Sequence, residues 1–120
     1  MKPDLERLAF DQYLERLPQD SESEISVLHV AHLRRVWELI LSHFSPDFDL
    51  PVACPTQDGA LQLSWTANGK HTSIDVYANG EGDWFFHDRE TLLFTGGSLV
   101  QGGSLPKDFL RLLALCKRKS

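Results

Sequence analysis

The sequence predicts a single α+β domain over residues 1–120, with two N-terminal helices, a four-stranded antiparallel meander and a C-terminal helix. Apolar residues recur at a helical period near both ends of the chain and at a period of two in the middle. Asn68-Gly69 and Asn79-Gly80 are turn signals that divide the middle into short strands. We therefore expect a helical part at 1–44, an antiparallel sheet at 60–96 and a C-terminal helix at 105–118.

The first helix is expected over residues 4–16, where apolar side chains form one stripe, and Pro18 ends the segment. Ser21 and Glu24 have the spacing of a capping box, which predicts that a second helix follows and runs to about His43. That helix carries a wide apolar face, made of Ile25, Leu28, Leu33, Val36, Trp37, Ile40 and Phe44.

A proline-rich stretch at 45–59 predicts a long ordered loop between the helices and the sheet. The strand that follows alternates apolar and polar residues and ends at Asn68-Gly69, the strongest short hairpin signal. A two-residue turn there fixes the pairing with the next strand. The expected pairs are Trp65 with Thr72, Ser64 with Ser73, Leu63 with Ile74, Gln62 with Asp75 and Leu61 with Val76.

The next turn, at 79–82, predicts a second hairpin that pairs Val76 with Phe85 and Tyr77 with Trp84. The third strand, 84–87, places aromatic residues next to one another in sequence. Because neighbouring strand residues point to opposite faces, both faces of the sheet must carry aromatic side chains. A fourth strand is expected at 91–95, then a glycine-rich flexible loop, and a last helix from Leu105 to Lys117.

Composition and charge exclude several classes of protein. The net charge is −5, which argues against the basic footprint that binding to nucleic acid requires. No apolar run is long enough to span a membrane, and the acidic N-terminus does not resemble a signal peptide. Cys54 and Cys116 form no CxxC motif and predict free thiols in a reducing compartment, so we expect a cytoplasmic protein.

No residue set in the chain forms a catalytic, cofactor or metal signature. The loop before the last helix resembles a phosphate-binding loop, but Gly103 stands where the phosphate-binding lysine belongs. His29 and His32 are spaced to share an ion, yet no third ligand has diagnostic spacing. His87 or His71 could serve as a general base, which leaves a small metal-independent hydrolase or ribonuclease as an alternative. We expect no catalytic residue, no cofactor and no metal.

The aromatic strands are the most informative feature. If three short helices cannot cover both faces of the sheet, an exposed aromatic band with an acidic rim would form a surface for a protein partner. The acidic rim would select a partner with a basic surface. The expected partner-binding residues are Tyr77, Trp84, Phe86, Asp75, Glu81 and Asp83.

The segment from Pro51 to Phe86 carries Pro55-Thr56-Gln57-Asp58-Gly59, a strand that ends in Trp65, and Ile74-Asp75-Val76 before a turn. This order resembles a pattern in a group of small bacterial proteins found near phage genes, mobile elements and toxin–antitoxin genes. The usual Asp-Gly of the second turn is Asn79-Gly80 here. The resemblance covers about residues 51–86 and implies no catalytic residues.

The sequence therefore predicts a non-enzymatic protein-binding module. By the resemblance, it would be an inhibitor, an antitoxin-like protein or an accessory subunit of a bacterial defence or counter-defence system that occludes a surface of its partner. The hydrolase above is one alternative. A structural subunit or homodimer formed through the same aromatic band is the other.

Overall fold

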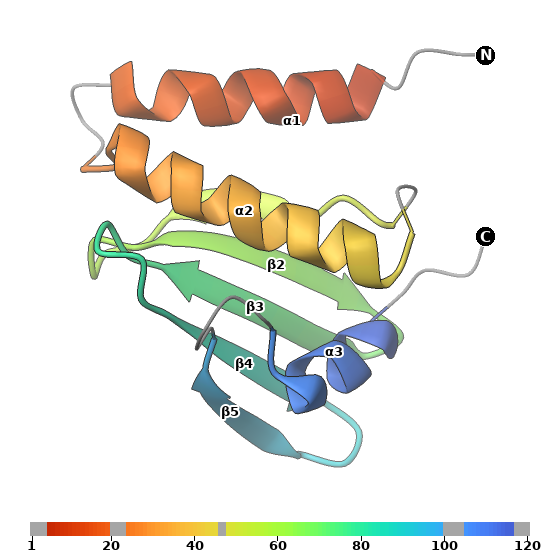
Figure 1. Ribbon diagram of the computed structural model, residues 1–120. Coiled ribbons are helices and arrows are strands. Elements are labelled where there is room, and N and C mark those ends of the chain that lie inside the picture. The colour runs from red at the N-terminus through yellow and green to blue at the C-terminus, as the bar shows by residue number, and fades with distance from the viewer. Residues whose placement is uncertain (1–4, 20–23, 46–47, 100–104, 117–120) are drawn as a thin grey trace.

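A computed structural model describes residues 5–19, 24–45, 48–99 and 105–116 (Figure 1). The strands form one antiparallel sheet in the order β1-β2-β3-β4-β5, so each strand pairs with its neighbours in sequence. The expected α+β class is confirmed, with five strands in place of four. The elements are α1 (Leu5–Arg16), η1 (Leu17–Gln19), α2 (Val27–His43), β1 (Val52–Pro55), β2 (Leu61–Ala67), β3 (Lys70–Val76), β4 (Gly82–Asp88), β5 (Phe94–Ser98) and α3 (Lys107–Ala114).

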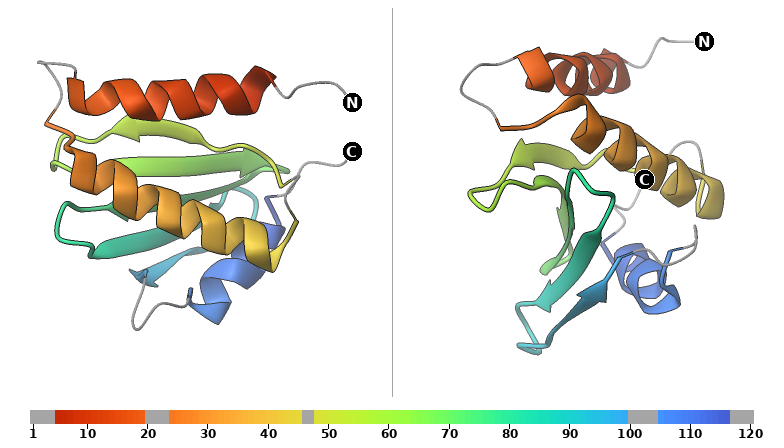
Figure 2. Two further views of the ribbon diagram at one scale, coloured as in Figure 1. Left: turned by 45° about the horizontal axis from the view of Figure 1, so that its top comes forward. Right: turned by 60° about the vertical axis from the view of Figure 1, so that its left-hand side comes forward.

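All three α-helices lie on one side of the sheet. Figure 2 shows α2 and α3 against this side and α1 alongside α2. The helices and the sheet enclose a single core cluster, because the apolar side chains of β2, β3 and β4 point toward them. Representative core residues are Leu14, Leu33, Ile40, Leu63, Ile74, Phe86, Phe109 and Leu113.

The hairpin of β2 and β3 has the predicted register. Every expected pair is present, from Leu61 opposite Val76 to Trp65 opposite Thr72. Asn68 and Gly69 have φ angles of 58° and 75°, the left-handed conformation that a two-residue hairpin turn requires. The Asn-Gly pair therefore fixes which residues of both strands face the helices.

The predicted register of the hairpin of β3 and β4 is wrong. Val76 pairs with Gly82 and Ile74 pairs with Trp84, a shift of three residues. The turn is tighter than expected, because the Tyr77 N–H donates to the Glu81 carbonyl at 2.9 Å and Gly82 already belongs to β4. An odd shift moves every side chain of β4 to the opposite face from the one that the expected pairs assign.

The edge strands of the sheet differ from the expectation: β1 falls in an expected loop, and β5 is shifted from the strand expected at 91–95. Strand β1 follows Pro51 and ends at Pro55, inside the expected loop, and an edge strand tolerates proline because only one of its sides pairs with another strand. Strand β5 begins at Phe94 rather than at Thr91. Asp88 delays it, since its carboxylate accepts the Glu90 N–H at 2.9 Å and holds the chain in a turn.

The second helix begins later than expected. Ser26 is its N-cap, and the cap is reciprocal: the Ser26 hydroxyl accepts the His29 N–H, and His29 Nδ1 accepts the Ser26 N–H at 2.9 Å. A histidine thus takes the place of the glutamate in a capping box. The predicted cap at Ser21 lies outside the described residues, as does Lys117 at the predicted end of the last helix. None of the described helices is long and apolar enough to cross a membrane.

Candidate functional site

The side of the sheet away from the helices has no layer of described residues over it (Figure 2). We call this side the open face. It is made by the alternate residues of β1 to β5 that point away from the core. These are Val52, Cys54, Gln62, Ser64, Thr66, His71, Ser73, Asp75, Asp83, Phe85, His87, Phe94, Gly96 and Ser98.

Trp84 and Phe86 do not belong to the open face. They are only 5% and 1% exposed, and the Trp84 ring packs against Phe109 of α3 at 6.0 Å between centroids. This corrects the expectation that an exposed aromatic band contains Trp84 and Phe86. A partner cannot touch these residues unless α3 leaves the sheet.

An acidic pair lies at one end of the open face. Asp75 and Asp83 are cross-strand neighbours, and the Gln62 amide donates to Asp75 Oδ1 at 2.8 Å. Burial raises the pKa of the Asp75 carboxyl, and the negative charges of Asp83 and Asp58 raise it further. The carboxylates therefore repel one another in the absence of a cation, and a basic side chain placed between them would relieve that repulsion.

Tyr77 and Glu81 lie in the turn that adjoins this acidic end. Burial raises the pKa of the Tyr77 hydroxyl, as do the nearby charges of Asp75 and Asp83. The Glu81 side chain is exposed. Four of the six expected partner-binding residues thus gather at one end of the open face, and Trp84 and Phe86 lie on its far side.

An aromatic pair lies toward the other end. Phe94 is 68% exposed, and its ring is 6.4 Å from that of Phe85 on the neighbouring strand. The side chains flanking Phe85 across the sheet are small, since its partners are Ser73 and Gly96. A Cβ at Gly96 would lie 2.5 Å from the Trp84 carbonyl and 3.2 Å from the Phe85 ring, so glycine is needed where β5 approaches β4.

Sequence reasoning missed Phe85 as a surface residue because the wrong register turned it inward. Alternation alone could not identify it: Trp84 and Phe86 share one face and Phe85 the other, but only the register determines which face points outward. The exposure of Phe94 was missed for a different reason. Phe94 was expected near the end of the strand 91–95, whereas it begins β5.

Two histidines complete the open face. His71 and His87 are cross-strand neighbours, and Thr66 Oγ1 lies 2.7 Å from His71 Nδ1. Burial lowers the pKa of His71, and the charges of Arg89 and His87 lower it further, which favours a neutral ring. The His87 ring lies 6.2 Å from that of Phe94 and extends the aromatic end.

The described residues do not assemble an acid–base pair around these histidines. Asp88 follows His87 but points to the helix side, where its Oδ2 lies 4.0 Å from Lys70 Nζ. No described carboxylate hydrogen-bonds to either ring. The hydrolase alternative therefore gains no geometric support here.

The histidines of α2 have separate surroundings. His29 is buried, and its Nε2 lies 2.9 Å from the Gly59 carbonyl while its Nδ1 serves the helix cap. Both nitrogens are thus engaged, and His32 lies instead beside Gly80. Among the described residues, no group of three His, Cys, Asp or Glu side chains could hold a metal ion.

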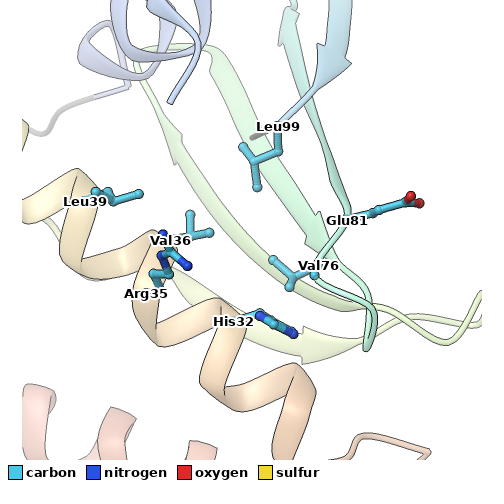
Figure 3. Close-up of a pocket in the computed structure, with 8 residues that line it drawn as sticks. His32, Arg35, Val36, Leu39, Val76, Glu81 and Leu99 are labelled. Carbon is cyan, nitrogen blue, oxygen red and sulfur yellow. The ribbon is translucent and has the colours of Figure 1, made fainter. Parts of the chain in front are cut away.

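A small cavity lies between α2 and the strands. Figure 3 shows His32, Val36 and Leu39 on the helix side and Val76 and Leu99 on the strand side. Its volume is about 100 Å³, below the roughly 300–1,000 Å³ typical of sites for small molecules. The open face is therefore the stronger candidate for a functional surface.

The open face combines an acidic end with an aromatic end on one sheet. Such a surface can bind another macromolecule but has no cleft that would exclude water from a reaction. In comparisons with known proteins, no family model matches the chain, and no curated protein or solved structure matches it either.

Proposed function

We propose that this chain is a non-enzymatic protein-binding module whose open face covers a basic surface of its partner. The observation that carries the proposal is the open face itself: all three α-helices lie on the opposite side of the sheet (Figure 2). The uncovered side nevertheless carries Phe85 and the largely exposed Phe94. Large aromatic side chains in such positions supply much of the binding energy at protein interfaces.

The charges of the open face support a basic partner. Asp75 and Asp83 are its acidic side chains, and Tyr77 and Glu81 adjoin them in the turn. The lowered pKa of His71 favours its neutral form, so this ring does not oppose the acidic end at neutral pH. A basic surface would therefore be attracted during approach and would relieve the repulsion between the two carboxylates on contact.

Occlusion is the mechanism that this surface supports best. A broad sheet face that covers a basic active or nucleic-acid-binding surface would block access to it without chemistry of its own. The resemblance of residues 51–86 to bacterial proteins near phage and toxin–antitoxin genes agrees with a role as an inhibitor, antitoxin-like protein or accessory subunit. In that role the acidic and aromatic ends would both contact the partner.

The test is affinity purification of the tagged chain from its native host, with a variant of the open face and a variant of the helix side compared in parallel. Phe94→Ser removes an aromatic contact of the open face. Leu28→Ser is the matched control, because Leu28 is an exposed apolar residue (58%) on α2. We expect a partner that is retained by the wild type and by Leu28→Ser.

Phe94→Ser should weaken that binding by about 2 kcal/mol, roughly thirtyfold in affinity, if Phe94 is a central contact. Asp83→Asn should act mainly on the association rate and should reduce its dependence on salt. A partner that Leu28→Ser loses and Phe94→Ser retains would refute the assignment of the open face.

A further inference from the structure

The two edges of the sheet differ in how they are protected. Edge strand β1 follows Pro51 and ends at Pro55, and proline discourages further pairing because it has no N–H to donate. Edge strand β5, Phe94 to Ser98, has no proline and no charged residue. No described residue pairs with its outer side. An edge with neither protection is a template for another strand.

The backbone groups that point outward from β5 can be identified. The Leu99 N–H donates to the Gly82 carbonyl at 2.8 Å, and the Asp88 N–H donates to the Leu93 carbonyl at 2.9 Å. Residues in an antiparallel pair alternate between bonding to the partner strand and pointing away from it. The N–H and C=O groups of Phe94, Gly96 and Ser98 therefore point away from β4.

We propose that an extended segment of the protein partner pairs with β5 as a sixth strand of the sheet. This inference rests on the proposed function and specifies how the partner is held. The outward groups of Phe94, Gly96 and Ser98 would supply the hydrogen bonds. The same three residues contribute to the open face, so alternate side chains of the added strand would extend that face.

The neighbours of β5 define the chemistry of the segment. On the open face, Ser98 lies beside Asp83, with Asp75 on the next strand, so a position opposite Ser98 would be about 10 Å from Asp83. A long Lys or Arg side chain can reach across the small serine. A position opposite Phe94 would meet its exposed ring and favour an apolar residue.

An antiparallel segment, the more stable orientation, would therefore carry Lys or Arg at one position and an apolar residue four positions later. The position between them lies opposite Gly96, where the missing side chain leaves the Phe85 ring accessible. A β-branched residue fits there, since it suits a strand and would contact the ring. Positive charge at the first position is the feature that distinguishes this partner from any other extended peptide.

The test uses a library of random twelve-residue peptides displayed on phage and selected against the immobilised full chain. We expect enriched peptides with Lys or Arg four positions before an apolar residue. Binding of a synthetic copy should slow amide exchange at Phe94, Gly96 and Ser98 by about tenfold or more, because these amides become hydrogen-bonded. Amides of Thr95 and Gly97, which already face β4, serve as internal controls.

A pair of variants tests the edge directly. Ser98→Pro removes an outward N–H that the sheet itself does not use, whereas Ser98→Ala keeps it. We expect Ser98→Pro to weaken peptide binding by about tenfold or more and Ser98→Ala to leave it nearly unchanged. If Ser98→Pro does not fold, the exchange measurement on the wild type decides the question alone.

Two results would overturn the inference: no enriched peptide, or enriched peptides that leave the exchange of Phe94, Gly96 and Ser98 unchanged. Neither result contradicts the proposed function if the Phe94→Ser variant fails to bind a partner that the Leu28→Ser variant still binds. In that case the partner binds the open face without adding a strand. If Leu28→Ser loses the partner and Phe94→Ser retains it, the proposed function fails on its own test.

Discussion

Truncation of neighbouring residues in β4 tests which face of the sheet each side chain occupies. Trp84 is packed against α3 in the core, so Trp84→Ala removes a large buried ring and leaves a cavity. Substitutions of this kind cost about 3–5 kcal/mol. Phe85 lies on the open face with no layer above it and keeps part of its surface in water. We expect Phe85→Ala to cost only about 1–2 kcal/mol.

Unfolding in urea, followed by circular dichroism, measures both losses. For a domain of this size, 1 kcal/mol corresponds to a change of about 4 °C in melting temperature. We therefore expect Trp84→Ala to melt roughly 12–20 °C below the wild type and Phe85→Ala roughly 4–8 °C below it. An independent check is the double variant Trp84→Ala with Phe109→Ala, whose losses should not add because the two rings are in contact.

The order of the two losses is the decisive result. If Phe85→Ala destabilises the chain as much as Trp84→Ala or more, then Phe85 is core and β4 has the register that the sequence analysis expected. The open face would then lose its central aromatic residue.

Three further predictions follow from the electrostatics and burial. Burial raises the pKa of Asp75 above its ordinary 3.8, so the folded state binds this proton more tightly than the unfolded state. The free energy of unfolding therefore falls as pH rises from 3.8 through the raised value. Asp75→Asn should remove that loss and raise the melting temperature at pH 7. Burial lowers the pKa of His71 below its ordinary 6.5, so the stability that the neutral ring contributes is lost as pH falls from 6.5. A proton NMR titration of the His71 ring should have its midpoint below 6.5. A midpoint above 6.5 would contradict the burial of His71. Cys116 is buried, and burial raises the pKa of its thiol, whereas Cys54 is partly exposed. A thiol reagent should therefore modify Cys54 about tenfold faster than Cys116 in the native state. Equal rates of modification would contradict the packing of Cys116.

Much of the sheet was predictable where a single turn type fits the sequence. Asn68-Gly69 admits one tight turn, and every pair of β2 with β3 follows from it. The stretch from Asn79 to Gly82 contains two glycines and admits several turns. The hydrogen bond from Tyr77 to Glu81 selects a different one from that expected. Because the resulting shift is odd, one local error inverted the assignment of every aromatic residue in β4.

Strand β1 was missed and the bounds of β5 were misplaced, because the sequences of both edge strands break the usual rules. Strand β1 follows Pro51 and ends at Pro55, and β5 contains two consecutive glycines. Such residues are tolerated at an edge, and Gly96 is required there by its close approach to Trp84. That requirement comes from the packing of two strands and cannot be read from β5 alone.

The candidate site was predicted in part. Asp75 and Asp83 were expected at the surface because they are charged, and they lie together because both flank the second turn. The aromatic half of the expected surface was placed on the wrong residues, since which of two adjacent rings faces outward depends on the register. The position of the helices, all on one side of the sheet, was not encoded in any local pattern.

Site-specific photo-crosslinking tests the central claim, that the open face contacts a protein partner, most directly. A photoreactive phenylalanine analogue is placed at Phe94 in one variant and at Leu28 in another, and both are irradiated in the native host. We predict that the Phe94 variant forms a covalent adduct with a protein that has a basic surface, and that the Leu28 variant does not. An adduct at Leu28 alone, or none at Phe94, would contradict the claim.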